Sequence, residues 1–179
     1  MSQDADPPLP ADPFGPYEPT ADDSWDIRKA GHLLRRVTFG ATADRLDKVL
    51  QCHSPAAAID SLLDYDPQLD PFAQLAEQTE GLVQFDSAES VQKWWIYRML
   101  YSPQPAQEKI ALFWHNRFAT SVTKVPPMWL WNQIDMFRRK GLGSFRDLVV
   151  SVGRDPAMLA WLDGQTSRKG KPTKTMAAS

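Results

Sequence analysis

Signals that start a helix recur along the chain from Ser24 onward, and this pattern favours a helical fold. Ser, Thr and Asp side chains can accept hydrogen bonds from the free N–H groups of a first helical turn, and proline is tolerated at its first position. Ser54-Pro55 and Asp155-Pro156 combine both signals. The residues that follow such signals repeat apolar side chains every three to four positions, as a helix requires.

The predicted helices run from Ser24 to about Val37, Thr42 to about Cys52, Ser54 to about Tyr65, Ser87 to Ser102, Pro105 to about Lys124, Met128 to Lys140, Ser144 to Arg154, and Asp155 to Asp163. Only Leu148-Val149-Val150 offers a short β-branched run, and no window alternates as a strand would. The sequence therefore predicts an all-α protein, an irregular bundle of about seven to eight helices.

The first part of the chain has a different composition. Residues 1–23 contain six Pro and five Asp but few aliphatic residues. Such a segment cannot bury enough apolar area to offset the entropy lost on ordering. We therefore expect a disordered arm over residues 1–23 and a helical body over residues 24–172.

Composition excludes few functions. The chain has 179 residues and a formal net charge of −2, so it has no general attraction for nucleic acid. We expect neither nucleic-acid binding nor a membrane span, because no stretch approaches the roughly 20 apolar residues that a span requires. A glycine-rich phosphate loop is absent, and nothing indicates a cofactor. No secretory signal is visible, so the location is open and cytoplasmic by default.

One histidine lies in the otherwise apolar string FWHNRF, residues 113–118. His115 is interpreted first as a buried imidazole satisfied by a backbone carbonyl or a neighbouring Asn or Asp. The alternative is a general acid or base whose pKa is shifted by that burial. Only three histidines are present, and no HExxH, CxxC or His-x3-His spacing occurs, so no metal site is expected.

An arginine pair, Arg35 and Arg36, lies in the first predicted helix. Adjacent helical positions point about 100° apart, so one guanidinium can face the core while the other stays in water. We expect an internal ion pair with Asp155 or Asp147, with an anion site as the alternative. The basic run Arg138 to Lys140 is explained by the negative end of the helix dipole. Trp-rich helices, as at Trp94-Trp95, are expected to supply the core.

Three longer strings resemble a bacterial family, domain of unknown function 1800. The strings are AGHLLRRVTFGAT, EKIALFWHNRFATSVTKV and GSFRDLVVSVGRDPAMLAWLDGQTSRKGKP, and the resemblance covers about residues 30–172. It implies a larger helical protein without established activity, often exported and frequently encoded beside a sulfatase-like companion. The recurrent Arg pair of the family falls on Arg35 and Arg36, its FWH block on residues 113–115, and its RDPAML block on residues 154–159. Arg117 stands where the family commonly has a second His, which argues further against a metal site.

The last seven residues, TKTMAAS, depart from this resemblance. The family continues after Pro172 with a helix of the form Asn-Glu-Asn-[Phe/Tyr]-[Ala/Gly]-Arg-Glu-Leu. Codons that encode TKTMAAS can be chosen so that the neighbouring frame reads Asn-Glu-Asn-Tyr-Gly-Arg-Glu. We therefore expect residues 173–179 to be a frameshifted tail, and the chain to be a truncated product without independent activity. Genomic DNA beyond the Pro172 codon tests this expectation.

Two function classes stay open. The first is a helical binding or assembly module that packs against the missing C-terminal half or the sulfatase-like companion. The alternative is part of an enzyme, a possible hydrolase, whose site the missing half completes. Its candidate catalytic residues are His115, Asn116, Arg35, Arg36, Arg154 and Asp155.

Overall fold

The computed structural model describes residues 15–64 and 87–166, and these ranges contain eight α-helices and no strand. The predicted all-α bundle is confirmed. The helices are α1 (Ile27–Val37), α2 (Ala43–Leu50), α3 (Pro55–Leu63), α5 (Ala88–Tyr101), α6 (Pro105–Arg117), α7 (Pro127–Lys140), α8 (Phe145–Gly153) and α9 (Pro156–Trp161), followed by a 3₁₀ turn over Gly164–Thr166.

Two parts of the sequence interpretation fall largely outside the described residues. Of the predicted arm, only residues 15–23 are described, and they contain no helix. The predicted frameshifted tail, residues 173–179, lies outside the described ranges altogether, so the shift of reading frame after Pro172 stays a prediction.

Side-chain caps explain most helix starts. Ser54, Ser87, Ser144 and Asp155 each accept a hydrogen bond from the backbone N–H three residues later, as their sequence positions predicted. The first helix is an exception, because its cap is Asp26, which accepts from the N–H of Lys29 at 2.9 Å, and not the predicted Ser24.

Helix α6 is shorter than predicted. It ends at Arg117, seven residues before Lys124, and residues 121–125 form a turn in which the Val125 N–H donates to the Ser121 carbonyl at 2.9 Å. Residues 120–123 are Thr-Ser-Val-Thr, and their hydroxyl and β-branched side chains disfavour a helix interior. The expected end at Lys124 was therefore wrong.

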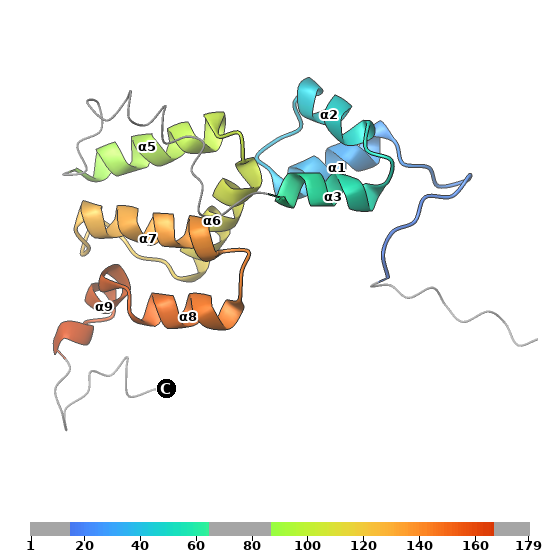
Figure 1. Cartoon of the computed structure of the whole chain (residues 1–179). Helices are drawn as coiled ribbons and strands as arrows, with labels where there is room; N and C mark the ends of the chain where they lie inside the picture. The colour runs from blue at the N-terminus through green and yellow to red at the C-terminus, as the bar shows by residue number, and fades with distance from the viewer. Residues whose placement is uncertain (1–14, 65–86, 167–179) are drawn as a thin grey trace, which may run out of the picture.

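The helices form two groups that meet at α6. Figure 1 shows α5, α7 and α8 lying one below another, while α1, α2 and α3 gather at the other end of the molecule. Helix α7 is central in the larger group, because it contacts α5, α6, α8 and α9. Its Phe137 is fully buried in a core to which Trp94, Trp95 and Leu148 also belong. The smaller group has its own core around Ala30, Leu34, Val49 and Ala58.

A lysine joins the two groups. The Nζ atom of Lys109, on α6, donates to the carbonyls of Thr38 at 2.8 Å and Arg35 at 3.2 Å. These carbonyls lie at the C-terminal end of α1, where a cation satisfies unpaired acceptors and the helix dipole. Helices α1 and α3 both contact α6, so this capping fixes the smaller group against the larger one.

The end of α7 approaches α6 closely. The indole N–H of Trp114 donates to the carbonyl of Gly141 at 2.7 Å. A Cβ atom on Gly141 would lie only 2.9 Å from side-chain carbons of Ile110 and Trp114. Glycine is therefore required at this position by packing.

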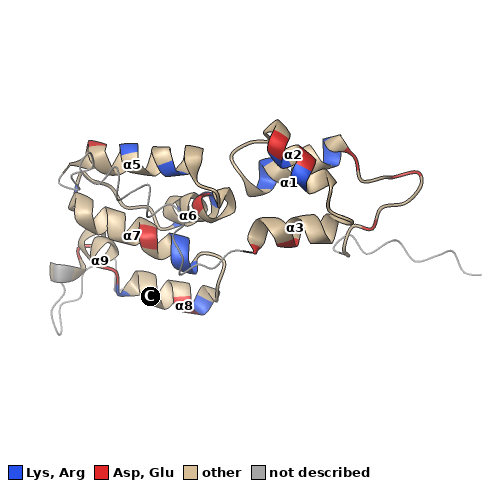
Figure 2. Cartoon of the chain, turned by 45° about the horizontal axis from the view of Figure 1, so that its top comes forward, with Lys and Arg blue, Asp and Glu red and all other residues tan. Residues whose placement is uncertain are grey.

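Charged residues are mixed over the surface. In the view of Figure 2, basic and acidic residues occur together on several helices, including α2 and α7, and no continuous basic face appears. This distribution agrees with the near-neutral formal charge of −2.

Candidate functional site

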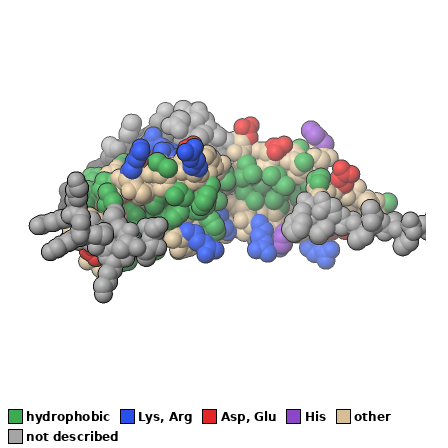
Figure 3. All heavy atoms as spheres, turned by 90° about the horizontal axis from the view of Figure 1, so that it is seen from below, with side chains coloured by type: hydrophobic (Ala, Val, Ile, Leu, Met, Phe, Trp, Pro, Cys, Tyr) green, Lys and Arg blue, Asp and Glu red, His purple; other side chains and the backbone are tan. Residues whose placement is uncertain are grey.

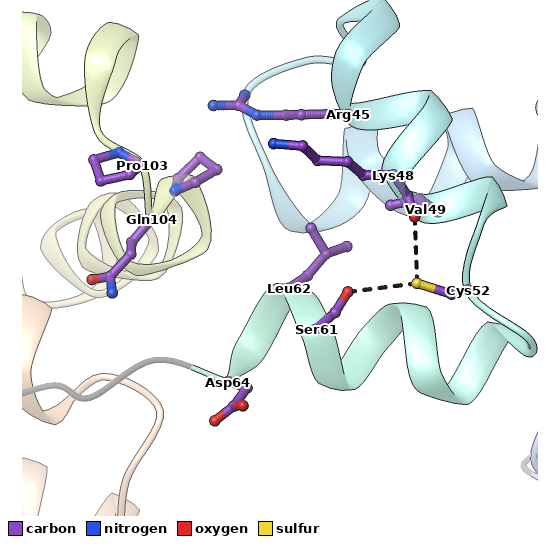
Figure 4. Close-up of a pocket in the computed structure, with 10 residues that line it drawn as sticks. Arg45, Lys48, Val49, Cys52, Ser61, Leu62, Asp64, Pro103 and Gln104 are labelled. Carbon is purple, nitrogen blue, oxygen red and sulfur yellow. Dashed lines mark hydrogen bonds between the residues drawn. The ribbon is translucent and has the colours of Figure 1, made fainter.

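A polar cleft lies where α2 and α3 face the turn between α5 and α6 (Figure 4). Its volume is about 350 Å³. Arg45 and Lys48 are one helical turn apart on α2, and their side chains extend toward Pro103, while the Asp64 carboxylate points away from them (Figure 4). Within the described ranges, neither cation forms an ion pair. The cleft can thus attract an anion.

The cleft also contains the one cysteine of the chain. The Cys52 thiol donates to the Lys48 carbonyl at 3.4 Å, and its Sγ lies 4.0 Å from Ser61 Oγ. No histidine lines this cleft to act as a base for either group. Arg45, Lys48 and Ser61 were not predicted as site residues from the sequence, although the spacing of the two cations on one helix indicates that they share a face.

A second, more apolar hollow lies between the segment before α1 and helices α1 and α3. We call it the Trp25 hollow; its volume is about 560 Å³. It is lined by Tyr17, Asp23, Trp25, Lys29, His32, Leu33, Arg36, Pro55 and Ile59. The indole Nε1 of Trp25 is buried and has no hydrogen-bond partner. The hollow therefore combines apolar walls with a basic rim.

A buried ionic cluster links α5, α6 and α7. Glu108 is fully buried, and its Oε1 accepts hydrogen bonds from Nε of Arg138 at 2.8 Å and Nε of Arg98 at 3.2 Å. Arg138 also donates to Asp135 at 2.9 Å and to Gln107 at 3.0 Å. The interpretation of Arg138 as a cation serving only the helix dipole was wrong, since its side chain is buried and pairs with carboxylates.

This cluster was missed although the sequence contained a signal for it. Glu108 lies three residues before the buried Ala111 and therefore on the core-facing side of α6. A carboxylate on that side needs a cation, because burying an unpaired charge is costly. Since the cluster is enclosed within the bundle, its evident role is to hold three helices together.

A second buried polar chain runs through Asp155. Gln133 receives a hydrogen bond from the Thr120 hydroxyl at 2.6 Å and donates to Asp155 Oδ2 at 2.6 Å. The same oxygen accepts from the N–H of Met158 at 2.9 Å. Burial raises the pKa of the Asp155 carboxyl above its ordinary value, although the donors of Met158 and Gln133 oppose this shift.

His115 is half-buried beside an aromatic ring. Its imidazole makes an edge contact with Trp95, with ring centroids 5.2 Å apart and planes at 86°. Its Nδ1 is buried without a hydrogen-bond partner. The backbone carbonyl or neighbouring Asn or Asp that the sequence predicted as a partner is therefore not found at this nitrogen. Burial lowers the pKa of His115, which keeps the ring neutral near pH 7.

Comparison with known proteins places the chain in a family. The model of a family described as protein of unknown function (DUF1800) matches residues 32–173, which is more than half of the chain. The chain belongs to the DUF1800 family. A search of curated proteins and a search of solved structures each found no match.

The sequence blocks that suggested DUF1800 do not form one site. Arg35 and Arg36 are both exposed on α1, whereas Asp155 pairs with Gln133 at the far end of the larger group. The expected ion pair between this arginine pair and Asp155 was therefore wrong, and Asp147 is exposed on α8. Both arginines can stay in water because the buried residues Ala30 and Leu34 lie on the other side of α1.

The other candidates of this DUF1800 chain are also separate. Asn116 is exposed at the end of α6, and Arg154 is exposed after α8. Across residues 15–64 and 87–166, no hydrogen bond or ion pair joins any two of the six catalytic candidates. Within the same ranges, no group of three or more His, Cys, Asp or Glu side chains could hold a metal ion. The helices described there include none long and apolar enough to span a membrane.

Proposed function

We propose that this DUF1800 chain is a helical binding or assembly module in which α8 packs against a further apolar helix. The observation that carries the proposal is an exposed apolar surface at the start of α8, which we call the α8 apolar face. It consists of Leu142 in the turn before the helix and of Phe145 and Val149 on the helix, with 47%, 62% and 41% of their surfaces exposed.

Helix α8 has one broad apolar side that the bundle covers only in part. Phe145, Leu148, Val149 and Val152 follow the spacing i, i+3, i+4, i+7 and therefore share this side. Leu148 and Val152 are buried against the bundle, whereas Phe145 and Val149 are exposed. The apolar side of a surface helix normally faces the core. The exposed edge of this side on α8 is therefore available to a further helix.

The α8 apolar face is part of a wider apolar surface. Figure 3 views the molecule from the α8 side, where hydrophobic side chains form broad areas between scattered Lys and Arg. Phe145 is also pre-positioned, because its ring stacks on Trp114 at 5.8 Å between centroids. Large exposed apolar surfaces are rare on soluble monomers, and those that occur often mark protein interfaces. The proposed partner is an amphipathic helix whose apolar stripe covers this face.

Dye binding tests the proposal. The purified chain is titrated with an uncharged hydrophobic dye and compared with the variant Phe145→Ser/Val149→Ser and with the control Ile27→Ser, which removes an equally exposed side chain from α1. We expect the double variant to bind roughly two-fold less dye, and the control to behave as wild type. A wild-type chain that is helical but binds no dye contradicts the proposal, as does an equal effect of the control.

The enzyme alternative has less support. A hydrolase site needs a nucleophile or activated water, a base and a charge stabiliser within reach of one atom. His115 faces Trp95, and Arg35 contributes its carbonyl to Lys109, so these candidates take part in separate packing arrangements. A helical module is supported by the exposed α8 apolar face, whereas no comparable arrangement among the described residues supports catalysis.

A further inference from the structure

We propose that the Trp25 hollow binds a small apolar molecule with one carboxylate, and that Arg36 receives the carboxylate. The inference does not depend on the α8 apolar face, because the hollow lies in the smaller helix group, at the opposite end of the molecule from α8 (Figure 1). It also gives a role to one of the two arginines that the sequence analysis selected.

The size and walls of the hollow suit such a ligand. Its volume of about 560 Å³ falls within the roughly 300–1,000 Å³ typical of small-molecule sites. Leu33 on α1 and Ile59 on α3 supply aliphatic walls, and Trp25 supplies an aromatic one. These walls favour an alkyl or aryl group and give no recognition for a sugar or a nucleotide phosphate chain.

The charges at the rim determine the sign of the ligand. Lys29 is already neutralised, since its Nζ pairs with Asp23 and donates to Tyr17 Oη at 2.6 Å and the Ser24 carbonyl at 2.8 Å. Arg36 and His32 also line the hollow, and neither has an ion-pair partner among the described residues. The unmatched charge at the rim is therefore positive. A guanidinium binds a carboxylate through two parallel hydrogen bonds, which makes Arg36 the fitting partner.

Titration of the full chain with octanoate tests this inference. The variant Arg36→Gln removes the charge but keeps most of the side chain, and Arg35→Gln is the matched control, because Arg35 is exposed on the same helix but does not line the hollow. We expect calorimetry to show that Arg36→Gln weakens octanoate binding roughly ten-fold, the loss expected for a charge-assisted hydrogen bond, while Arg35→Gln has no effect. Octylamine, with the opposite charge, should not bind.

A second variant tests the wall without touching the cations. Ile59→Glu places a negative charge at a position with 39% exposure, where the fold should tolerate it, and we expect it to abolish octanoate binding. Circular dichroism establishes that each variant is folded. The inference is overturned if octanoate fails to bind the folded wild type, if Arg35→Gln and Arg36→Gln act equally, or if octylamine binds as well as octanoate. Octanoate titration of the Phe145→Ser/Val149→Ser variant keeps the two proposals separate, because this variant should bind octanoate as the wild type does whether or not the α8 apolar face is an interface.

Discussion

The guanidinium Nε of Arg138 donates to Oε1 of Glu108 at 2.8 Å, and the side chains of both residues are almost completely buried, with 2% and 0% exposure. This contact joins α7 to α6, and Arg98 extends it to α5 by binding the same oxygen. Three helices of the larger group are therefore connected through one carboxylate. Its removal leaves buried cations without their nearest counter-charge.

Glu108→Gln is expected to destabilise the protein strongly. The amide keeps the shape of the side chain but removes the negative charge between Arg98 and Arg138. Breaking a buried ion pair in this way costs about 3–5 kcal/mol. Urea unfolding measures the loss, and Glu89→Gln, which breaks an exposed pair with Lys93, is the control without measurable effect. Equal unfolding midpoints for the two variants would show that the buried cluster does not stabilise the fold.

Gly141→Ala tests the close contact between α6 and α7. The added methyl group would lie within 2.9 Å of Ile110 and Trp114, so we expect a loss of about 1–3 kcal/mol in the free energy of unfolding. Gly153→Ala is the matched control, because a Cβ there meets nothing within 4 Å. Alanine also favours the helix at that position, so the control should be neutral or slightly stabilising. A neutral Gly141→Ala result would mean that the two helices separate easily.

The pH dependence of stability should reveal the burial of Asp155. Because its pKa is raised in the folded state, the folded protein binds more protons than the unfolded chain between the ordinary and the raised value. The free energy of unfolding contributed by this group therefore falls as pH rises through that window. Compared with Asp155→Asn, which cannot ionise, the wild type should lose stability from about pH 4 upward. An increase over the same range would contradict the raised pKa.

His115 should have the opposite dependence. Its pKa is lowered by burial, so the unfolded chain binds more protons just below the ordinary value, and stability rises with pH up to about 6.5. His115→Phe retains a ring beside Trp95 and removes the unpartnered Nδ1. We expect this variant to unfold less readily than wild type at about pH 5.5. If urea unfolding shows that acid destabilises both proteins equally, the imidazole of His115 is exposed to water and the prediction is wrong.

Local signals in the sequence predicted the helices better than they predicted partners. Ser54, Ser87, Ser144 and Asp155 cap helices where expected, because capping depends only on nearby residues. The end of α6 was misplaced because apolar spacing continues past Arg117 while the hydroxyl residues that follow favour a turn.

Long-range pairs could not be read in the same way. Asp155 pairs with Gln133 and not with the arginine pair, because the packing of α9 on α7 decides which side chains meet. Hydrophobic spacing shows that α1 has a buried side but not which helix covers it. The Trp25 hollow likewise depends on how α3 packs beside α1 and the segment before it.

Sedimentation velocity over a range of concentrations tests the central claim, that the α8 apolar face is an interface, most directly. Without its partner helix, the wild-type chain should associate increasingly as concentration rises, and Phe145→Ser/Val149→Ser should remain monomeric with unchanged helix content. A wild-type chain that sediments as a monomer at every concentration, or a double variant that associates as strongly as the wild type, would contradict the claim.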